Sequence, residues 1–134
     1  MFKDYFDKVR PVMALATAVN NIPSSRIVSY VFSPKKENII YVITQPKTSK
    51  VKEIMQNNKV SIVTISGDNG ETISSNNAIA RISDISPKEL YPLFETNPQF
   101  VKRHPDVSTE IVIEIELFSA IVDSDDSERQ YYEF

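Results

Sequence analysis

The sequence predicts a mainly β domain in which about six antiparallel strands, accompanied by short α-helices, close into a small barrel. Runs rich in β-branched and aromatic residues recur along the chain, and the turns between them are short, which favours hairpin connections. The chain has 134 residues, so we expect one domain with one core over residues 1–134. A closed barrel leaves no exposed strand edge; a two-layer sandwich is the alternative.

The predicted strands differ in how much of their surface is apolar. The first is bounded by Pro11 and by an Asn20–Asn21 turn, which indicates a hairpin with the second. The last alternates apolar residues with Glu114 and Glu116, so we expect one of its faces to contact water. The predicted strands cover residues 12–19, 25–33, 39–44, 59–66, 71–85 and 110–123.

Helical spacing interrupts the strands at a few places. An amphipathic segment opens the chain and ends before Pro11, and Thr48 is a candidate N-cap for a helix in the middle of the chain. Pro87 suits the first turn of a later helix. The predicted helical segments are residues 2–9, 48–57, 87–95 and 98–104.

The composition excludes several kinds of site. The chain has no cysteine and one histidine, His104, which excludes thiol chemistry, disulfides and multi-histidine metal sites. Its two glycines form no GxGxxG or GxxxxGK[ST] motif. The net charge is −3, with ten Lys/Arg against four Asp/Glu in residues 1–60 and five against fourteen in residues 61–134. An acidic chain is a poor candidate for nucleic-acid binding, but its basic first half suits one small anion.

Several further features are expected to be structural rather than functional. No run approaches the ~20 apolar residues of a membrane span, and the start of the chain, with Asp4 and Asp7 and no apolar core, is unlike a signal peptide. We therefore expect a cytoplasmic protein that binds no membrane. We expect His104 to lie alone on the surface, and the acidic residues 123–128 to be solvated rather than to bind calcium. The aromatic end, residues 131–134, either packs on its own barrel or contacts a partner subunit or ligand.

The strongest functional pattern is a group of cations and hydroxyls around the start of the predicted helix 48–57. If the second and third strands pair, Arg26 and Thr44 lie at the same end of the sheet, close to the helix start. Free N–H groups at a helix start attract anions, and hydroxyls with two cations suit a phosphate. The alternative is an ordinary capped helix with solvated side chains. The candidate phosphate group comprises Arg26, Thr44, Thr48, Ser49 and Lys50.

The order of motifs in residues 12–66 resembles the pyridoxamine 5′-phosphate oxidase-like family of FMN-binding split barrels. That family shows a strand ending in Leu-Ala-Thr, a turn with proline, a strand opening with arginine, a Tyr-x-x-Thr strand, a Ser/Thr-x-Lys helix start and an asparagine before the next strand. The matching pieces are Leu15-Ala16-Thr17, Pro23, Arg26, Tyr41 to Thr44, Thr48-Ser49-Lys50 and Asn58-Lys59-Val60.

The resemblance implies a six-stranded split barrel that binds FMN at the interface of a homodimer. It implies that Arg26 and Lys50 hold the FMN phosphate together with the hydroxyls of Thr44, Thr48 and Ser49. It also implies that the backbone of Ile27, Val28 and Ser29 runs along the flavin ring. The flavin would supply the redox chemistry, so no catalytic residue is assigned.

The sequence also departs from true pyridoxamine phosphate oxidases. Ser49 replaces an arginine at the helix start, a loss for which Lys47 or Lys52 could compensate, and Val31 replaces a substrate lysine. The C-terminal segment lacks the arginine and histidine that hold substrate phosphate. We therefore expect an FMN-dependent oxidoreductase of unknown substrate that does not oxidise pyridoxamine phosphate. The alternatives are a non-enzymatic binder of flavin, haem or a deazaflavin, or a ligand-free dimeric scaffold.

Overall fold

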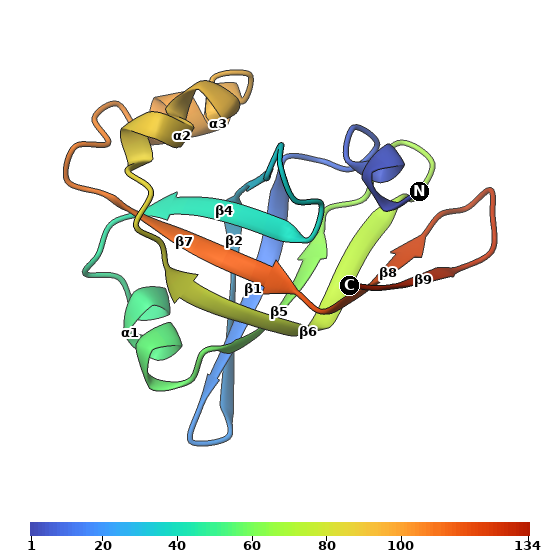
Figure 1. The fold of residues 1–134 in the computed structure, drawn as a ribbon, viewed down its shortest axis with the longest axis horizontal. Coiled ribbons are helices and arrows are strands. Elements are labelled where there is room, and N and C mark those ends of the chain that lie inside the picture. Colours follow the sequence, from blue (N-terminus) through green and yellow to red (C-terminus); the bar gives the residue numbers. More distant parts are fainter.

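The computed structural model describes residues 1–134 and is dominated by one curled antiparallel sheet (Figure 1). Seven strands follow the order β2-β1-β5-β6-β7-β4-β3, while β8 pairs with β6, and β9 pairs with β8. The strands are β1 Val12–Val19, β2 Ile22–Ser29, β3 Val31–Phe32, β4 Ile39–Thr44, β5 Lys59–Thr64, β6 Thr72–Ile82, β7 Ile111–Leu117, β8 Ser119–Asp123 and β9 Gln130–Glu133. The mainly β, split-barrel prediction is confirmed, but the count of six strands is too low.

The extra strands arise where the chain changes partner. The predicted strand 25–33 divides at Tyr30, because residues before it pair with β1 whereas Val31 and Phe32 pair with β4. β2 and β3 lie at opposite ends of the strand order, and the chain passes from one directly to the other at Tyr30. This connection brings the two ends of the sheet together and curls it. The predicted strand 110–123 divides at Phe118, where the chain passes from β7 to β8. The short polar β9 was not predicted.

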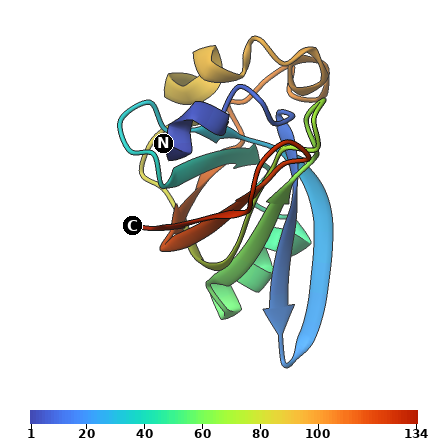
Figure 2. The same ribbon diagram turned by 90° about the vertical axis from the view of Figure 1, so that its right-hand side faces the viewer.

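The β1–β2 hairpin follows the predicted Asn20–Asn21 turn. Both asparagines have positive φ angles, 52° and 65°, the conformation that a two-residue hairpin turn requires. The hairpin extends beyond the rest of the barrel (Figures 1 and 2).

Four short helices accompany the sheet, and none is long and apolar enough to cross a membrane. The predicted helix 2–9 is wrong beyond its first turn, because the aromatic residues pack as a cluster in which Phe2 is buried and Phe6 stacks on Phe32 at 3.6 Å between ring centroids. The helices are the 3₁₀ turn η1 Phe2–Tyr5 and the α-helices α1 Ser49–Gln56, α2 Pro87–Phe94 and α3 Pro98–Arg103.

The core has two parts, separated by β4. The larger cluster fills the curled sheet, and the smaller one lies between β4 and the pair α2 and α3. All six residues of β4 are buried, because one face, with Ile40, meets the larger cluster and the other, with Tyr41, meets the smaller one. Figure 1 shows α2 and α3 lying over this strand. The strand therefore ends at Thr44 in a fixed position, and α1 begins a few residues later.

Candidate functional site

Arg26 lies in a network formed by β1, β2 and α1. It pairs with Leu15 across the two strands, and its Nη1 donates to the Thr17 hydroxyl at 2.9 Å and to the Leu15 carbonyl at 3.3 Å. Its Nη2 lies 2.6 Å from Glu53 Oε1 on α1, and the Thr17 hydroxyl donates to the same oxygen at 2.9 Å. The guanidinium retains further N–H donors that none of these partners uses. Arg26 is therefore held in place and still able to bind an anion.

Lys50 lies in the first turn of α1 and reaches the end of β4. Its Nζ donates to Thr44 Oγ1 at 2.8 Å. The pKa of Lys50 is lowered, first by burial and then by the charge of Arg26, while the Glu110 carboxylate acts in the opposite direction. Arg26 and Lys50 are thus near enough to repel each other, as two cations around one anion site would be.

The structure brings these predicted residues together, and the predicted pairing of strands 25–33 and 39–44 is present only at Val31 and Phe32. Arg26 lies in β2, which pairs with β1, and α1 links it to Thr44: Glu53 of this helix bonds to Arg26, and Lys50 bonds to Thr44. We call this group, Thr17, Arg26, Thr44, Lys50 and Glu53, the cation cluster. Sequence reasoning missed Thr17 and Glu53 as parts of it. Glu53 lies three residues after Lys50, and this spacing places the two on one side of the predicted helix, which could have indicated that Glu53 belongs to the cluster.

The start of α1 is arranged differently from the prediction. Thr48 is the N-cap by position, but its side chain makes no capping bond and its hydroxyl instead donates to the Gln45 carbonyl at 3.1 Å. Ser49 is exposed. The first N–H groups of a helix have no partner within the helix, so this end of α1 still offers backbone donors beside Lys50.

The predicted flavin-ring segment presents its residues to two sides of β2. Val28 is buried in the core, whereas the Ile27 side chain is 55% exposed. Ser29 is half-buried, and its hydroxyl accepts from the Asn97 amide at 3.4 Å. The exposed surface next to Arg26 is therefore apolar at Ile27.

His104 is not the isolated surface residue that the sequence suggested. Its Nδ1 lies 2.8 Å from Glu110 Oε1, its ring stacks on Phe100, and the Glu110 side chain is only 2% exposed. A buried carboxylate needs such a partner, which the sequence separation did not reveal. No group of three or more His, Asp or Glu side chains could hold a metal ion. At the acidic end, Arg129 pairs with Asp123.

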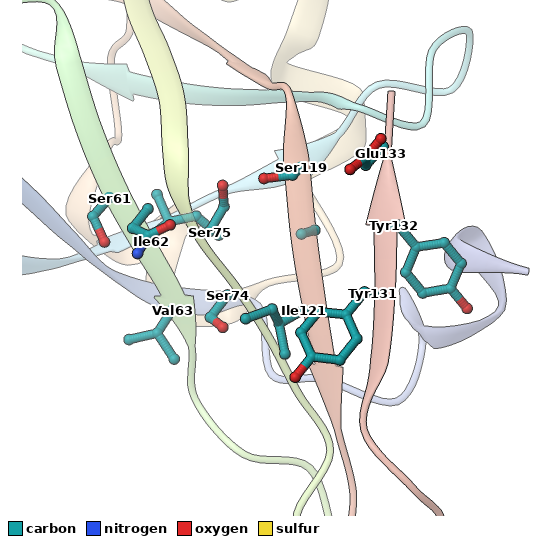
Figure 3. Close-up of a pocket in the computed structure, with 12 residues that line it drawn as sticks. Ser61, Ile62, Val63, Ser74, Ser75, Ser119, Ile121, Tyr131, Tyr132 and Glu133 are labelled. Carbon is teal, nitrogen blue, oxygen red and sulfur yellow. The ribbon is translucent and has the colours of Figure 1, made fainter.

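A second feature is a groove on the outer face of the sheet, with a volume of about 430 Å³, in which Glu133 is the one charged lining residue (Figure 3). One row of cross-strand neighbours runs through it, and Figure 3 shows four of its members, from Val63 on β5 through Ser74 and Ile121 to Tyr131 on β9. The same row continues over β1 and β2 through Ala14 and Ile27. We call this row the outer row; it comprises Ile27, Ala14, Val63, Ser74, Ile121 and Tyr131.

Two of the three aromatic residues at the C-terminus pack on their own chain, the first of the two alternatives that the sequence left open. Tyr132 and Phe134 pack on Phe2 of the same chain, with ring centroids 5.2 and 5.0 Å away. Tyr131 points the other way and is 71% exposed beside the groove. Tyr131 is therefore the most exposed of these aromatic residues.

Comparison with protein families identifies the chain. Residues 8–129 match the model of the family described as pyridoxamine 5′-phosphate oxidase-like. The chain belongs to this family. The resemblance predicted from residues 12–66 is confirmed and extends over nearly the whole chain. No curated protein matches the sequence significantly.

Solved structures confirm the fold. General Stress Protein 26 from Bacillus anthracis has a TM-score of 0.75 at 18% identity, covering 99% of this chain and 95% of that one. A pyridoxamine 5′-phosphate oxidase-related, FMN-binding protein from Nostoc punctiforme has a TM-score of 0.65 at 16% identity, covering 92% and 80%. A haem-binding protein from Mycobacterium smegmatis has a TM-score of 0.73 at 11% identity; it covers 98% of this chain, which spans 56% of that one.

Proposed function

We propose that this protein is a cytoplasmic FMN-binding flavoprotein that acts as a homodimeric oxidoreductase. The observation that carries the proposal is the convergence of Arg26 and Lys50, with the Thr44 hydroxyl, beside the start of α1. The FMN-binding protein similar to this chain supports the choice of ligand. The absence of cysteine suits a reducing compartment.

The cations and hydroxyls around the start of α1 would have separate parts in holding the phosphate. Arg26 offers its remaining N–H groups, and Lys50 offers an ammonium that is already pointed at the site by Thr44. The exposed Ser49 and the N-cap Thr48 add hydroxyls, and α1 adds backbone N–H donors. Bound FMN would supply the electron transfer, while the backbone of Ile27, Val28 and Ser29 would orient its ring.

The substrate is expected to differ from pyridoxamine phosphate. Val31 lies in β3, and the exposed Ser49 carries no charge, so the residues that distinguish the true oxidases are missing. Lys47 and Lys52, the possible replacements for the missing arginine, are both exposed, and in the cluster it is Lys50 that bonds to Thr44.

The outer row supports the homodimer. Its six positions carry no charge, and Val63, Ile27 and Tyr131 are 41%, 55% and 71% exposed. An extended face of this kind is unusual in a monomer, and two copies can approach closely because Ala14 and Ser74 are small. We propose that a second copy covers this row and that flavin lies at the interface.

A non-enzymatic binder of haem is the second candidate, because the chain is similar to a haem-binding protein over 98% of its length. The absorption spectrum of the purified protein separates the candidates. Flavin gives a yellow protein and haem a red-brown one, whereas a deazaflavin has a spectrum of its own. A scaffold without a ligand would be colourless even after incubation with each.

Titration with FMN and riboflavin tests the proposal. Charge-assisted hydrogen bonds to a phosphate contribute about 1.5–3 kcal/mol each, so FMN should bind at least about ten-fold more tightly than riboflavin. Flavin fluorescence measures both affinities. Equal affinities would show that the cation cluster is not a phosphate site.

A further inference from the structure

The cation cluster contains a carboxylate that a phosphate site does not require. Glu53 lies on α1, with its side chain 23% exposed, and its Oε1 accepts from both Arg26 and Thr17. These two bonds keep the pKa of the Glu53 carboxyl below its usual range; the Thr17 hydroxyl contributes most and Arg26 adds to it. The carboxylate is therefore ionised at neutral pH and permanently beside Arg26.

A phosphate on Arg26 would share this guanidinium with Glu53. Two anions on one guanidinium lie within roughly 6 Å of each other, which is shorter than the ~8 Å screening length at physiological ionic strength. They repel each other, and partial burial of the cluster strengthens the repulsion. Lys50 offsets this repulsion only in part, because the Glu53 carboxylate is bonded directly to the guanidinium that the phosphate would use, whereas Lys50 is bonded to the Thr44 hydroxyl.

We propose that Glu53 is a specificity-determining residue whose charge weakens phosphate binding at Arg26 and makes flavin phosphate an exchangeable ligand. This inference rests on the proposed function. The neutral Ser49 acts in the same direction, since the helix start carries no further cation to offset Glu53. The hydrogen bond from Arg26 to Glu53 holds the guanidinium in position, while the negative charge of Glu53 reduces the attraction of Arg26 for dianions.

Glu53→Gln separates geometry from charge. The glutamine carbonyl can still accept from Arg26 and Thr17, whereas the negative charge is gone. We expect FMN affinity to rise on the order of ten-fold and riboflavin affinity to stay within about two-fold. Glu89→Gln removes the same charge from an exposed position on α2 and should change neither affinity. If Glu53→Gln does not fold, Glu53→Asn is a second neutral replacement whose amide oxygen can accept a hydrogen bond, and it should raise FMN affinity in the same direction.

Inorganic phosphate provides a test that does not need flavin. Its effect on the thermal unfolding midpoint should be larger for Glu53→Gln than for the unmodified protein, even if no flavin binds. Absence of flavin binding would thus defeat the proposed function alone. Weaker FMN binding in Glu53→Gln, an equal change for FMN and riboflavin, or an unchanged phosphate effect would overturn the role of Glu53.

Discussion

The cation cluster and the outer row use neighbouring residues of one strand for opposite purposes. The Arg26 side chain lies on the face of the sheet next to α1, where it bonds to Thr17 of β1 and Glu53 of α1. Ile27, the next residue, projects to the opposite side and joins the outer row beside Ala14. The geometry of the cation cluster is set by a few long side chains that hydrogen bonds hold in place. The geometry of the outer row is set by the strand register, which aligns uncharged side chains across six strands. Changes to the two regions should therefore have different signatures.

The largest effect is expected from a charge in the outer row. Ala14 lies in β1 between Ile27 and Val63 of the flanking strands, so Ala14→Glu places a carboxylate in the middle of the proposed dimer face. An uncompensated buried charge costs about 3–5 kcal/mol, enough to give monomers at micromolar concentration. Light scattering with flavin present measures the change. Ile82→Glu, at an exposed position of β6 outside the row, is the matched control. If the unmodified protein is already a monomer, the row is not a dimer face.

A smaller effect, confined to ligand binding, is expected in the cation cluster. Lys50→Ala removes the ammonium that Thr44 positions, which should weaken FMN binding by about 1.5–3 kcal/mol. Riboflavin affinity and the dimer should stay unchanged, because Lys50 lies outside the outer row. Fluorescence titration measures FMN affinity and light scattering measures the dimer on the same sample, so together they show which of the two regions the substitution affects. An equal loss for both flavins would mean that Lys50 supports the fold of the site rather than the phosphate.

The two regions also differ in how far they could be predicted from the sequence. Most strands and the residues Arg26, Thr44 and Lys50 followed from local patterns and family motifs. The division at Tyr30 did not, because the chain changes partner there without any local signal. The predicted strand 25–33 therefore pairs with strand 12–19 before Tyr30 and with strand 39–44 only after it. Glu53, Thr17 and the pair His104–Glu110 also escaped prediction, because their partners are distant in the chain or belong to another element. The outer row could be recognised only after the register of six strands was known.

The charge state of Lys50 gives the next smaller effect. Its pKa is lowered by burial and by Arg26, so it loses its proton at a lower pH than an exposed lysine. FMN affinity should fall as the pH rises through that lowered pKa, by less than the loss in Lys50→Ala, since a neutral amine can still donate to the phosphate. Riboflavin affinity serves as the reference at each pH. Lys50→Arg, which keeps its charge, should abolish the fall in FMN affinity; a fall that persists would point to another group.

The smallest effect is expected at Lys52, two residues beyond Lys50 on α1. Residues two apart do not share a helix face, and Lys52 is exposed while Lys50 is half-buried against Thr44. Lys52→Ala should therefore change FMN affinity by only a few tenths of a kcal/mol, through the screened field of a surface charge. The competing hypothesis is that Lys52 reaches back to replace the cation missing at Ser49. Fluorescence titration of Lys52→Ala beside Lys50→Ala decides the matter. If the two substitutions weaken FMN binding equally, the phosphate lies further along α1, and the cation cluster is not its main site.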